Sequence, residues 1–273
     1  MNIAIISDVH SNLEALDATL SDISKHRVDR IMCLGDVVGF NADPQACISL
    51  LRSVNPVWVA GNHDRAVAGK ISTEGFSRIA VRAIGWTRER LDGETLEFLA
   101  RLPLKAKLDE YLIGVHGALH PSVGCELVRL DDDNRRYLSF QSLATTGVRI
   151  CAFGHTHRLG VFELHDNVMA DRTLEAADSL SLRADAYYLI NPGTVGQPRT
   201  AEQRATYMLF DTERQGITVR RVQYDRRASM RKTRAAGLAS PFSWLPRPVR
   251  SFLRNSLRAA GLGKKRSDGL GYD

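Results

Sequence analysis

Five short polar segments, each directly after a run of apolar residues, constrain the fold of this chain more than any other feature. They carry aspartate, asparagine and histidine, the residue types that bind metal ions, and occupy residues 7–10, 35–39, 61–64, 115–117 and 154–157. One such segment would carry little information, because Asp and His are common in loops. Five in succession indicate a sheet whose strands bring polar ends to one edge, where ligands of α/β proteins collect. The sequence therefore predicts one polar site assembled from distant parts of the chain.

The first and last segments each supply two metal-ligand side chains at a spacing of two residues. Asp8 and His10 follow an apolar, isoleucine-rich run that is typical of a buried strand. In extended backbone, residues two apart project to the same side, so both could reach one cation. His155 and His157 repeat this spacing and form the strongest single signal. The alternative is a loop in which Asp8 only accepts hydrogen bonds from backbone amides.

The second segment offers a carboxylate between two glycines. Gly35 and Gly39 allow a tight turn and a close approach of the chain to a ligand. The two oxygens of Asp36 suit a carboxylate shared by two cations. Taken alone, an ordinary turn with an Asp cap would explain this segment.

The third and fourth segments add an amide and further imidazoles. Asn62 offers an uncharged oxygen, and His63 followed by Asp64 resembles the imidazole and orienting carboxylate that a general acid needs. His116 ends an apolar run. A lone histidine in that place is more often structural, so His116 counts only together with the other segments.

In these segments the chain resembles the calcineurin-like metallophosphoesterases. The family pattern is Asp-X-His, Gly-Asp-X-X-Gly, Gly-Asn-His-Asp/Glu, His and Gly-His-X-His, and every element is present in order. The resemblance extends from Met1 to about Tyr224. It implies an α/β (α+β) fold, a four-layer αββα sandwich of two mixed β-sheets flanked by helices.

The resemblance also implies a role for each of these residues. One metal ion would be held by Asp8, His10, Asp36 and His157, and a second by Asp36, Asn62, His116 and His155, with Asp36 bridging. Asn62 and His63 would contact the substrate, with His63 over the leaving group and held by Asp64. Imidazole, carboxylate and amide ligands without a thiolate suit Mn, Fe, Ni or Zn, and the sequence does not choose among them.

The implied activity is hydrolysis of a phosphoester, in which a hydroxide bridging two metal ions attacks phosphorus in line and His63 protonates the departing alkoxide. Residues 39–44 lack the Asp-Arg of protein Ser/Thr phosphatases, and residues 191–199 resemble a loop of small prokaryotic phosphodiesterase-type members. We therefore expect a phosphodiesterase, with Arg199 as a candidate substrate contact. The alternative for that loop is a turn bounded by Gly and Pro.

Three other functions stay open from the sequence. A phosphomonoesterase would use the same ligands, and a nuclease would be recruited to DNA by the basic C-terminal residues. A non-catalytic scaffold with the same fold would show lost ligands, and none is lost here.

The charge of the chain changes sharply near residue 225. Residues 226–273 contain 12 Lys/Arg and 2 Asp, whereas residues 1–225 contain 25 basic and 29 acidic residues. We predict one metallophosphoesterase domain over 1–225 and a basic tail over 226–273, with an amphipathic helix near 247–260. Such a helix is typical of attachment to an anionic membrane surface, nucleic acid or a partner. Packing on the protein's own core, or on a second copy in a homo-oligomer, is the alternative.

The cysteines and the N-terminus indicate the compartment. Cysteines 33, 47, 125 and 151 show no paired spacing, which is typical of free buried thiols in a reducing cytosol. The first strand begins at Asn2 without a preceding secretory signal, and no segment is apolar enough to span a bilayer. We expect a cytoplasmic protein, peripheral at the membrane if the tail attaches it.

Local patterns predict further elements. Leu13, Leu16, Leu20 and Ile23 recur at helical spacing, Asp43 and Pro44 form a helix start, and residues 74–101 suggest two helices broken near Gly93. We expect late strands at 207–211 and 217–222 that complete the second sheet. Residues 165–185 are predicted to form a hairpin extension or a mobile loop.

Overall fold

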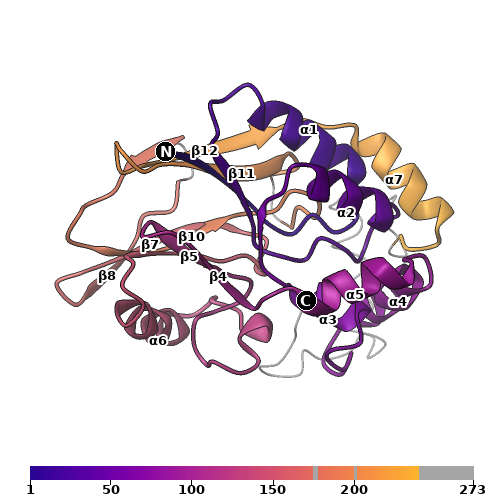
Figure 1. Cartoon of the computed structure of the whole chain (residues 1–273), viewed down its shortest axis with the longest axis horizontal. Helices are drawn as coiled ribbons and strands as arrows, with labels where there is room; N and C mark the ends of the chain where they lie inside the picture. Colours follow the sequence, from indigo (N-terminus) through magenta and orange to yellow (C-terminus); the bar gives the residue numbers. More distant parts are fainter. Residues whose placement is uncertain (175–177, 200–201, 240–273) are drawn as a thin grey trace, which may run out of the picture.

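The computed structural model of the chain describes residues 1–174, 178–199 and 202–239, and two mixed β-sheets form its centre (Figure 1). The first sheet has the order β3 (Val57–Trp58), β2 (Arg30–Cys33), β1 (Asn2–Ile6), β11 (Ala205–Asp211), β12 (Gly216–Val222) and β9 (Ser179–Ser181). The second has the order β4 (Lys105–Leu108), β5 (Leu112–Val115), β6 (Ile150–Ala152), β10 (Tyr187–Pro192), β7 (Leu159–His165) and β8 (Val168–Asp171).

Strand β1 shows why its sequence is apolar throughout. Ile3 and Ile5 belong to the hydrophobic cluster between the two sheets, whereas Ala4 and Ile6 belong to the cluster between the first sheet and its helices. All four are fully buried. Successive side chains of a strand point to opposite faces, so a strand covered on both sides needs an uninterrupted apolar run.

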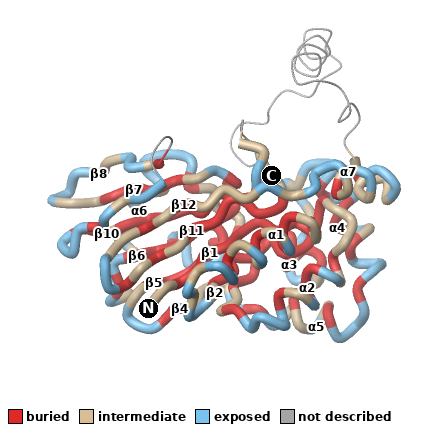
Figure 2. The backbone as a smooth tube through the Cα atoms, turned by 90° about the horizontal axis from the view of Figure 1, so that it is seen from above, coloured by how far each residue is buried: buried red, intermediate tan, exposed pale blue. Residues whose placement is uncertain are grey.

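Helices cover both outer faces of the paired sheets (Figure 1). The first sheet is covered by α1 (Leu13–Ile23), α2 (Pro44–Ser53) and α7 (Arg226–Ala235), and its core cluster continues into α3 (Asn62–Val67), α4 (Arg78–Arg88) and α5 (Gly93–Arg101). On the second sheet, Phe140 and Leu143 of α6 (Asp133–Ala144) share a cluster with Val115 and Leu189. The three stacked clusters confirm the predicted four-layer αββα sandwich. In Figure 2, buried residues run through the strands, and exposed residues lie mainly at the periphery.

Most of the elements expected from local patterns are present. Helix α1 begins at Leu13, α2 begins at Pro44 after Asp43, and residues 74–101 contain α4 and α5. The side chain of Asp43 makes no capping hydrogen bond. Its carboxylate instead lies 3.0 Å from Nζ of Lys232 in α7.

The late strands are correctly predicted, but they belong to the first sheet rather than to the second. Strand β11 pairs antiparallel with β1, and β12 continues from β11. Tyr207 belongs to the cluster under the helices and Met208 to the cluster between the sheets. Strand β10 of the second sheet is likewise buried on both faces, so the apolar pattern fits either sheet, and the long-range pairing with β1 decides between them. Strands β7 and β8 form a hairpin whose turn at Asp166 and Asn167 lies at the start of the predicted stretch 165–185, and β9, near its end, pairs with β12 of the first sheet.

Helix α7 contains the first residues of the predicted basic tail. It packs against α1, where Nζ of Lys232 lies 2.7 Å from Oε1 of Glu14, and Thr233 donates a hydrogen bond to Asn41. Part of the tail's charge is therefore neutralised by acids of the 1–225 region. The predicted amphipathic helix near 247–260 lies outside the described residues.

The cysteines match the prediction from the sequence. Cys33, Cys47, Cys125 and Cys151 are all buried and free, as predicted. Among the described residues, no helix is both long and apolar enough to cross a membrane.

Candidate metal centre

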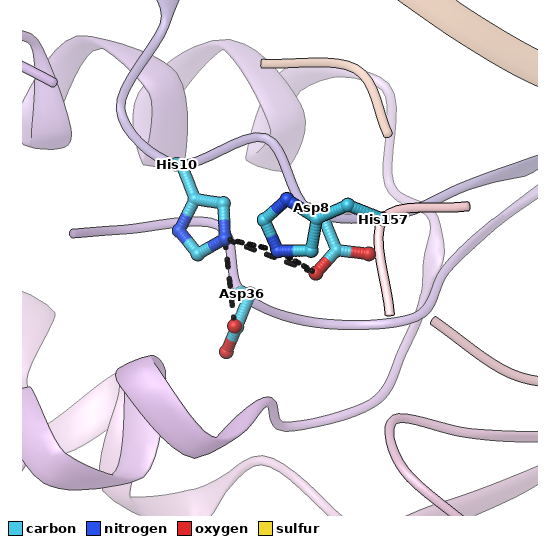
Figure 3. Close-up of side chains that lie close together, drawn as sticks. All are labelled: Asp8, His10, Asp36 and His157. Atoms are coloured by element: carbon cyan, nitrogen blue, oxygen red, sulfur yellow. Dashed lines mark hydrogen bonds and ion pairs between the residues drawn. The ribbon is translucent and has the colours of Figure 1, made fainter. Parts of the chain in front are cut away.

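The predicted ligands meet at one edge of the sandwich, in loops that follow β1, β2, β5 and β6. Two groups form, in each of which the ligand atoms all lie within 4.8 Å of one another: Asp8, His10, Asp36 and His157 in one, and Asp36, His116 and His155 in the other. Figure 3 shows the first group. Asp36 belongs to both groups, and none of these side chains belongs to a residue more than 3% exposed. The structure thus brings together every Asp and His that was predicted to bind metal.

The local backbone differs from the expectation of extended chain. Asp8 (φ 55°), His10 (φ 48°), Asp36 (φ 50°), His155 (φ 64°) and His157 (φ 57°) all lie in the left-handed region. The chain leaves each strand through a sharp turn, which directs these side chains into the site instead of alternating them across a sheet. Such backbone costs about 1–3 kcal/mol per residue and persists only where its surroundings hold it.

Hydrogen bonds between the loops hold this backbone in place. The amide of His10 donates to the carbonyl of Asp36 at 2.9 Å, and that of Asp8 donates to Gly35 at 3.1 Å. Ser7 Oγ donates to Asp8 Oδ2 at 2.6 Å. The first two segments are therefore fixed against each other independently of any ligand.

Backbone carbonyls orient three of the imidazoles. Nδ1 of His10 lies 3.1 Å from the carbonyl of Val38, and Nδ1 of His157 lies 2.8 Å from that of Gln197. His116 makes the same contact with Leu34 at 2.8 Å. Because a carbonyl only accepts, each Nδ1 carries the proton, and in the neutral ring Nε2 keeps its lone pair for a ligand.

The site contains buried acceptor atoms that face one another without a proton between them, an arrangement that a bound cation would stabilise. Nε2 of His10 faces Nε2 of His157 at 3.1 Å, although both rings already donate through Nδ1. Oδ1 of Asp8 lies 3.1 Å from the same Nε2 of His157, which has no proton to donate when the neutral ring carries it on Nδ1. Nε2 of His155 is also buried without a hydrogen-bond partner among the described residues. Unsatisfied buried acceptors are costly. A divalent cation in each group would satisfy them, so the residues present fit metal binding.

The protonation states suit this role. Burial lowers the pKa of His10, His155 and His157, which keeps these imidazoles neutral near pH 7. Burial acts to raise the pKa of Asp8 and Asp36, but His157 and His116 outweigh it and hold both pKa values below the ordinary range.

His116 is the exception among the imidazoles. Burial acts to lower the pKa of His116, but Asp36 outweighs it and raises that pKa to about 9. Nε2 of His116 lies 3.3 Å from Oδ2 of Asp36 and 3.0 Å from Oδ1 of Asn62. Asn62, the first residue of α3, therefore lies beside the second group, where the sequence predicted it.

Asp64 makes its hydrogen bonds with the backbone. Its carboxylate accepts from the amides of Val37, Val38 and Gly61 at 2.9, 3.2 and 3.0 Å. Burial and the nearby charge of Asp36 raise the pKa of Asp64 to about 6, against these hydrogen bonds. Asp64 thus ties the segment of Asp36 to the start of α3. Its predicted action on His63 stays a prediction.

His63 lies in an aromatic frame that sequence reasoning missed. Its ring centroid is 4.7 Å from that of Phe40, 5.4 Å from Phe76 and 4.9 Å from His10. Its backbone amide donates to Oδ1 of Asp36 at 2.8 Å. The signal for Phe40 was its position directly after Gly39. Phe76 carries no such signal.

The charges of two arginines act on the pKa values of site histidines. Burial has the largest effect on the pKa of His157, Asp8 the next, and Arg199 then acts to lower it. The guanidinium of Arg199 lies 5.9 Å from the Phe40 ring centroid. Arg129 likewise acts to lower the pKa of His155, after burial and other neighbours. Its Nη1 is buried without a hydrogen-bond partner among the described residues. No motif indicated Arg129, because only the folded chain brings it near His155.

The loop at 191–199 makes hydrogen bonds to two of the segments that carry the metal ligands. Asn191 donates to the carbonyl of Gly154 at 2.8 Å and to Oγ1 of Thr156 at 3.1 Å. Thr194 Oγ1 donates to the carbonyl of Asp8 at 2.8 Å. The loop therefore holds the segments of Asp8 and His155 together, and Arg199 extends from its end.

Gly61 tests how tightly these segments pack. A Cβ at this position would overlap the side-chain oxygen and the backbone nitrogen of Asp36. We expect Gly61→Ala to lower the free energy of unfolding by about 1–3 kcal/mol and to impair metal binding, because Asp36 must move. Chemical denaturation and metal titration measure both effects. Gly93→Ala is the control, since a Cβ there meets nothing within 4 Å. Equal stability of the two variants would show that the segments yield easily.

Known proteins share this architecture. The model of the calcineurin-like phosphoesterase superfamily domain matches residues 1–215. An uncharacterised protein of Methanocaldococcus jannaschii is 37% identical over 229 residues, which cover 82% of this chain and 88% of that protein. A metallophosphoesterase from Sphaerobacter thermophilus has 34% identity and a TM-score of 0.73, with 88% of this chain and 95% of that chain covered. A hypothetical protein from Pyrococcus horikoshii, at 18% identity and a TM-score of 0.70, covers 92% of this chain and 97% of its own, and shows the shared fold. This chain therefore belongs to the calcineurin-like phosphoesterase superfamily.

Proposed function

We propose that the protein is a metal-dependent phosphoester hydrolase that cleaves phosphodiesters. The observation that carries this proposal is the pair of buried ligand groups that share Asp36. One cation would be held by Asp8, His10, Asp36 and His157, and a second by Asp36, Asn62, His116 and His155. Mn, Fe, Ni and Zn all suit imidazole and carboxylate ligands.

The two cations, when bound, would activate a water molecule and stabilise charge on the attacking and leaving oxygens. The remaining work falls to the chain's own side chains. His63 is buried beside His10, and we assign to it the protonation of the leaving oxygen. The positive charges of Arg199 and Arg129, which act on the pKa values of His157 and His155, would attract an anionic phosphate. Asp64 and Thr194 act through the backbone, by positioning the segments of Asp36 and Asp8.

Two features of the sequence favour a diester as the substrate. Residues 39–44 lack the Asp-Arg of protein phosphatases, and residues 191–199 resemble the loop of phosphodiesterase-type members. The loop packs against the backbone of the ligands, so its shape bears on the space beside them. A phosphomonoesterase would use the same ligands and is separated by experiment.

Metal-stripped protein tests the proposal directly. It should hydrolyse neither bis-p-nitrophenyl phosphate nor p-nitrophenyl phosphate, and addition of Mn, Ni or Zn should restore hydrolysis, faster for the diester. A preference for the monoester would make the protein a phosphomonoesterase. Absence of turnover with every metal, in protein shown to be folded by circular dichroism, would contradict an enzymatic role for these ligands.

We also propose a cytoplasmic location, supported by the four free buried cysteines. Attachment of the tail to an anionic membrane surface or nucleic acid, or its packing on a second copy, is supported by the sequence of residues 226–273 alone.

A further inference from the structure

A cavity of about 420 Å³ lies against the metal centre, and the proposed reaction does not account for it. His157, a member of the first ligand group, forms part of its wall. Arg158 and Leu159 continue that wall, and Thr194 and Thr206 line another side. The volume falls within the range of small-molecule sites. A group placed in the cavity would therefore lie against the wall of the proposed metal site.

The described residues of the lining are cationic on balance and include no aromatic ring apart from the His157 imidazole. Among the described residues of the lining, three arginines, Arg158, Arg204 and Arg221, accompany one carboxylate, that of Glu202. Leu159, Leu174 and Pro198 supply its apolar surface. A nucleobase would find no large aromatic face on which to stack, whereas an anion would find donors and positive charge.

Two of the three arginines are already paired. Arg204 lies 2.7 Å from Glu202, and hydrogen bonds from Arg204 lower the pKa of Glu202 to about 2, so this carboxylate is ionised. Arg221 lies 2.6 Å from Asp178 and 3.5 Å from Glu202. These pairs hold the far side of the cavity in a fixed arrangement and largely cancel in charge.

Among the described residues of the lining, Arg158 supplies the charge that has no partner. Its side chain makes no hydrogen bond or ion pair with any of the residues that the structure describes, and the residue is exposed. It directly follows His157, whose Nδ1 is fixed by the carbonyl of Gln197. Its backbone is thus anchored at the metal centre while its guanidinium remains available to a ligand in the cavity.

We propose that this cavity binds a second phosphate group, carried by the organic part of the phosphoester, and that Arg158 is its principal contact. The inference rests on the proposed function and specifies the substrate class, a phosphoester that bears a further phosphate. A guanidinium presents paired donors that match phosphate oxygens, which a hydroxyl group of the same size does not.

A matched pair of diesters tests the substrate class. The first compound is p-nitrophenyl 3-phosphopropyl phosphate, which carries a terminal phosphate. The second is p-nitrophenyl 3-hydroxypropyl phosphate, which has a hydroxyl group in its place. Both diesters release the same nitrophenolate. With metal-loaded enzyme, kcat/KM should be about tenfold higher for the phosphopropyl diester, and the difference should lie in KM. Arg158→Gln should reduce this ratio to about one, and Arg158→Lys should restore part of it.

The control removes the same charge elsewhere. Arg214, between β11 and β12, has a side chain that is 89% exposed and does not line this cavity, so Arg214→Gln should leave the ratio unchanged. A ratio near one in the unaltered enzyme would overturn the proposal, as would a ratio that persists in Arg158→Gln.

A binding measurement separates this proposal from the proposed function. Calorimetry should show tighter binding of propanediol bisphosphate than of propyl phosphate to the metal-loaded protein, and Arg158→Gln should abolish the difference. This result would support phosphate binding in the cavity even if neither diester were hydrolysed. Equal binding of the two compounds would overturn the proposed phosphate site even if both diesters were cleaved.

Discussion

Replacing Asp36 by asparagine should lower the rate of metal-dependent hydrolysis by more than about 100-fold. Loss of a residue that only hydrogen-bonds to a metal ligand costs up to about 100-fold, and loss of the ligand itself should cost more. Asp36 is the one residue shared by both ligand groups. Its Oδ2 lies 3.6 Å from Nε2 of His10 and 3.3 Å from that of His116. An amide keeps one oxygen but places a neutral NH₂ where the second oxygen was, so both groups lose a charged ligand.

The fold should survive this change. Oδ1 of Asp36 accepts a hydrogen bond from the amide of His63, and an asparagine oxygen of the same shape still accepts it. Metal content measured after dialysis should fall together with the activity. Asp43→Asn is the control, because Asp43 follows in the same loop but pairs with Lys232 and belongs to neither ligand group. Retained metal and activity in Asp36→Asn would rule out the shared carboxylate as the basis of the site.

Replacing His63 by asparagine should slow the hydrolysis of different esters to different extents, depending on the leaving group. Transfer of a proton by a positioned imidazole contributes typically about 10²–10⁴ in rate. A dialkyl diester expels an alkoxide that needs this proton, so its kcat should fall by that factor. An aryl diester expels a stable phenolate, so its kcat should fall much less. The measurement is the dependence of kcat on the leaving-group pKa, which should steepen in the variant.

The contrast between the two esters separates proton donation from a structural role. His63 packs against Phe40 and Phe76, and a loss of packing would slow both esters equally. His165→Asn serves as the control, because His165 lies at the end of β7 and contacts Asp185, away from the ligand groups. An equal loss for both esters in His63→Asn would assign to His63 a positioning role instead.

Residue type and spacing carried much of the prediction. Asp8, Asp36 and His157 were identified because each follows an apolar run, and that pattern depends only on neighbouring residues. Helix α1 was predicted because leucines recur at helical spacing, and β1 because its apolar run has no gap. These patterns depend only on neighbouring residues, so they can be recognised without knowledge of the rest of the chain.

The contacts that orient the ligands could not be predicted in this way. The left-handed backbone of Asp8 and His155 results from hydrogen bonds with loops far away in the chain. Asp64 was predicted to orient His63, and the structure adds hydrogen bonds from the backbone amides of Val37, Val38 and Gly61 that no local pattern indicated. Strand β11 was expected in the second sheet and joins the first by pairing with β1, a long-range contact on which its own apolar pattern does not report.

The sequence by itself determined which side chains are available for metal chemistry, in which order they occur, and which helices and strands carry them. The tertiary structure alone decided the tautomers of His10 and His157, the approach of Arg129 to His155, and the cavity that Arg158 lines. The physical reason is distance along the chain. Periodicity and composition report on neighbouring residues, whereas a hydrogen bond from Thr194 to Asp8 exists only after strands far apart in sequence have packed.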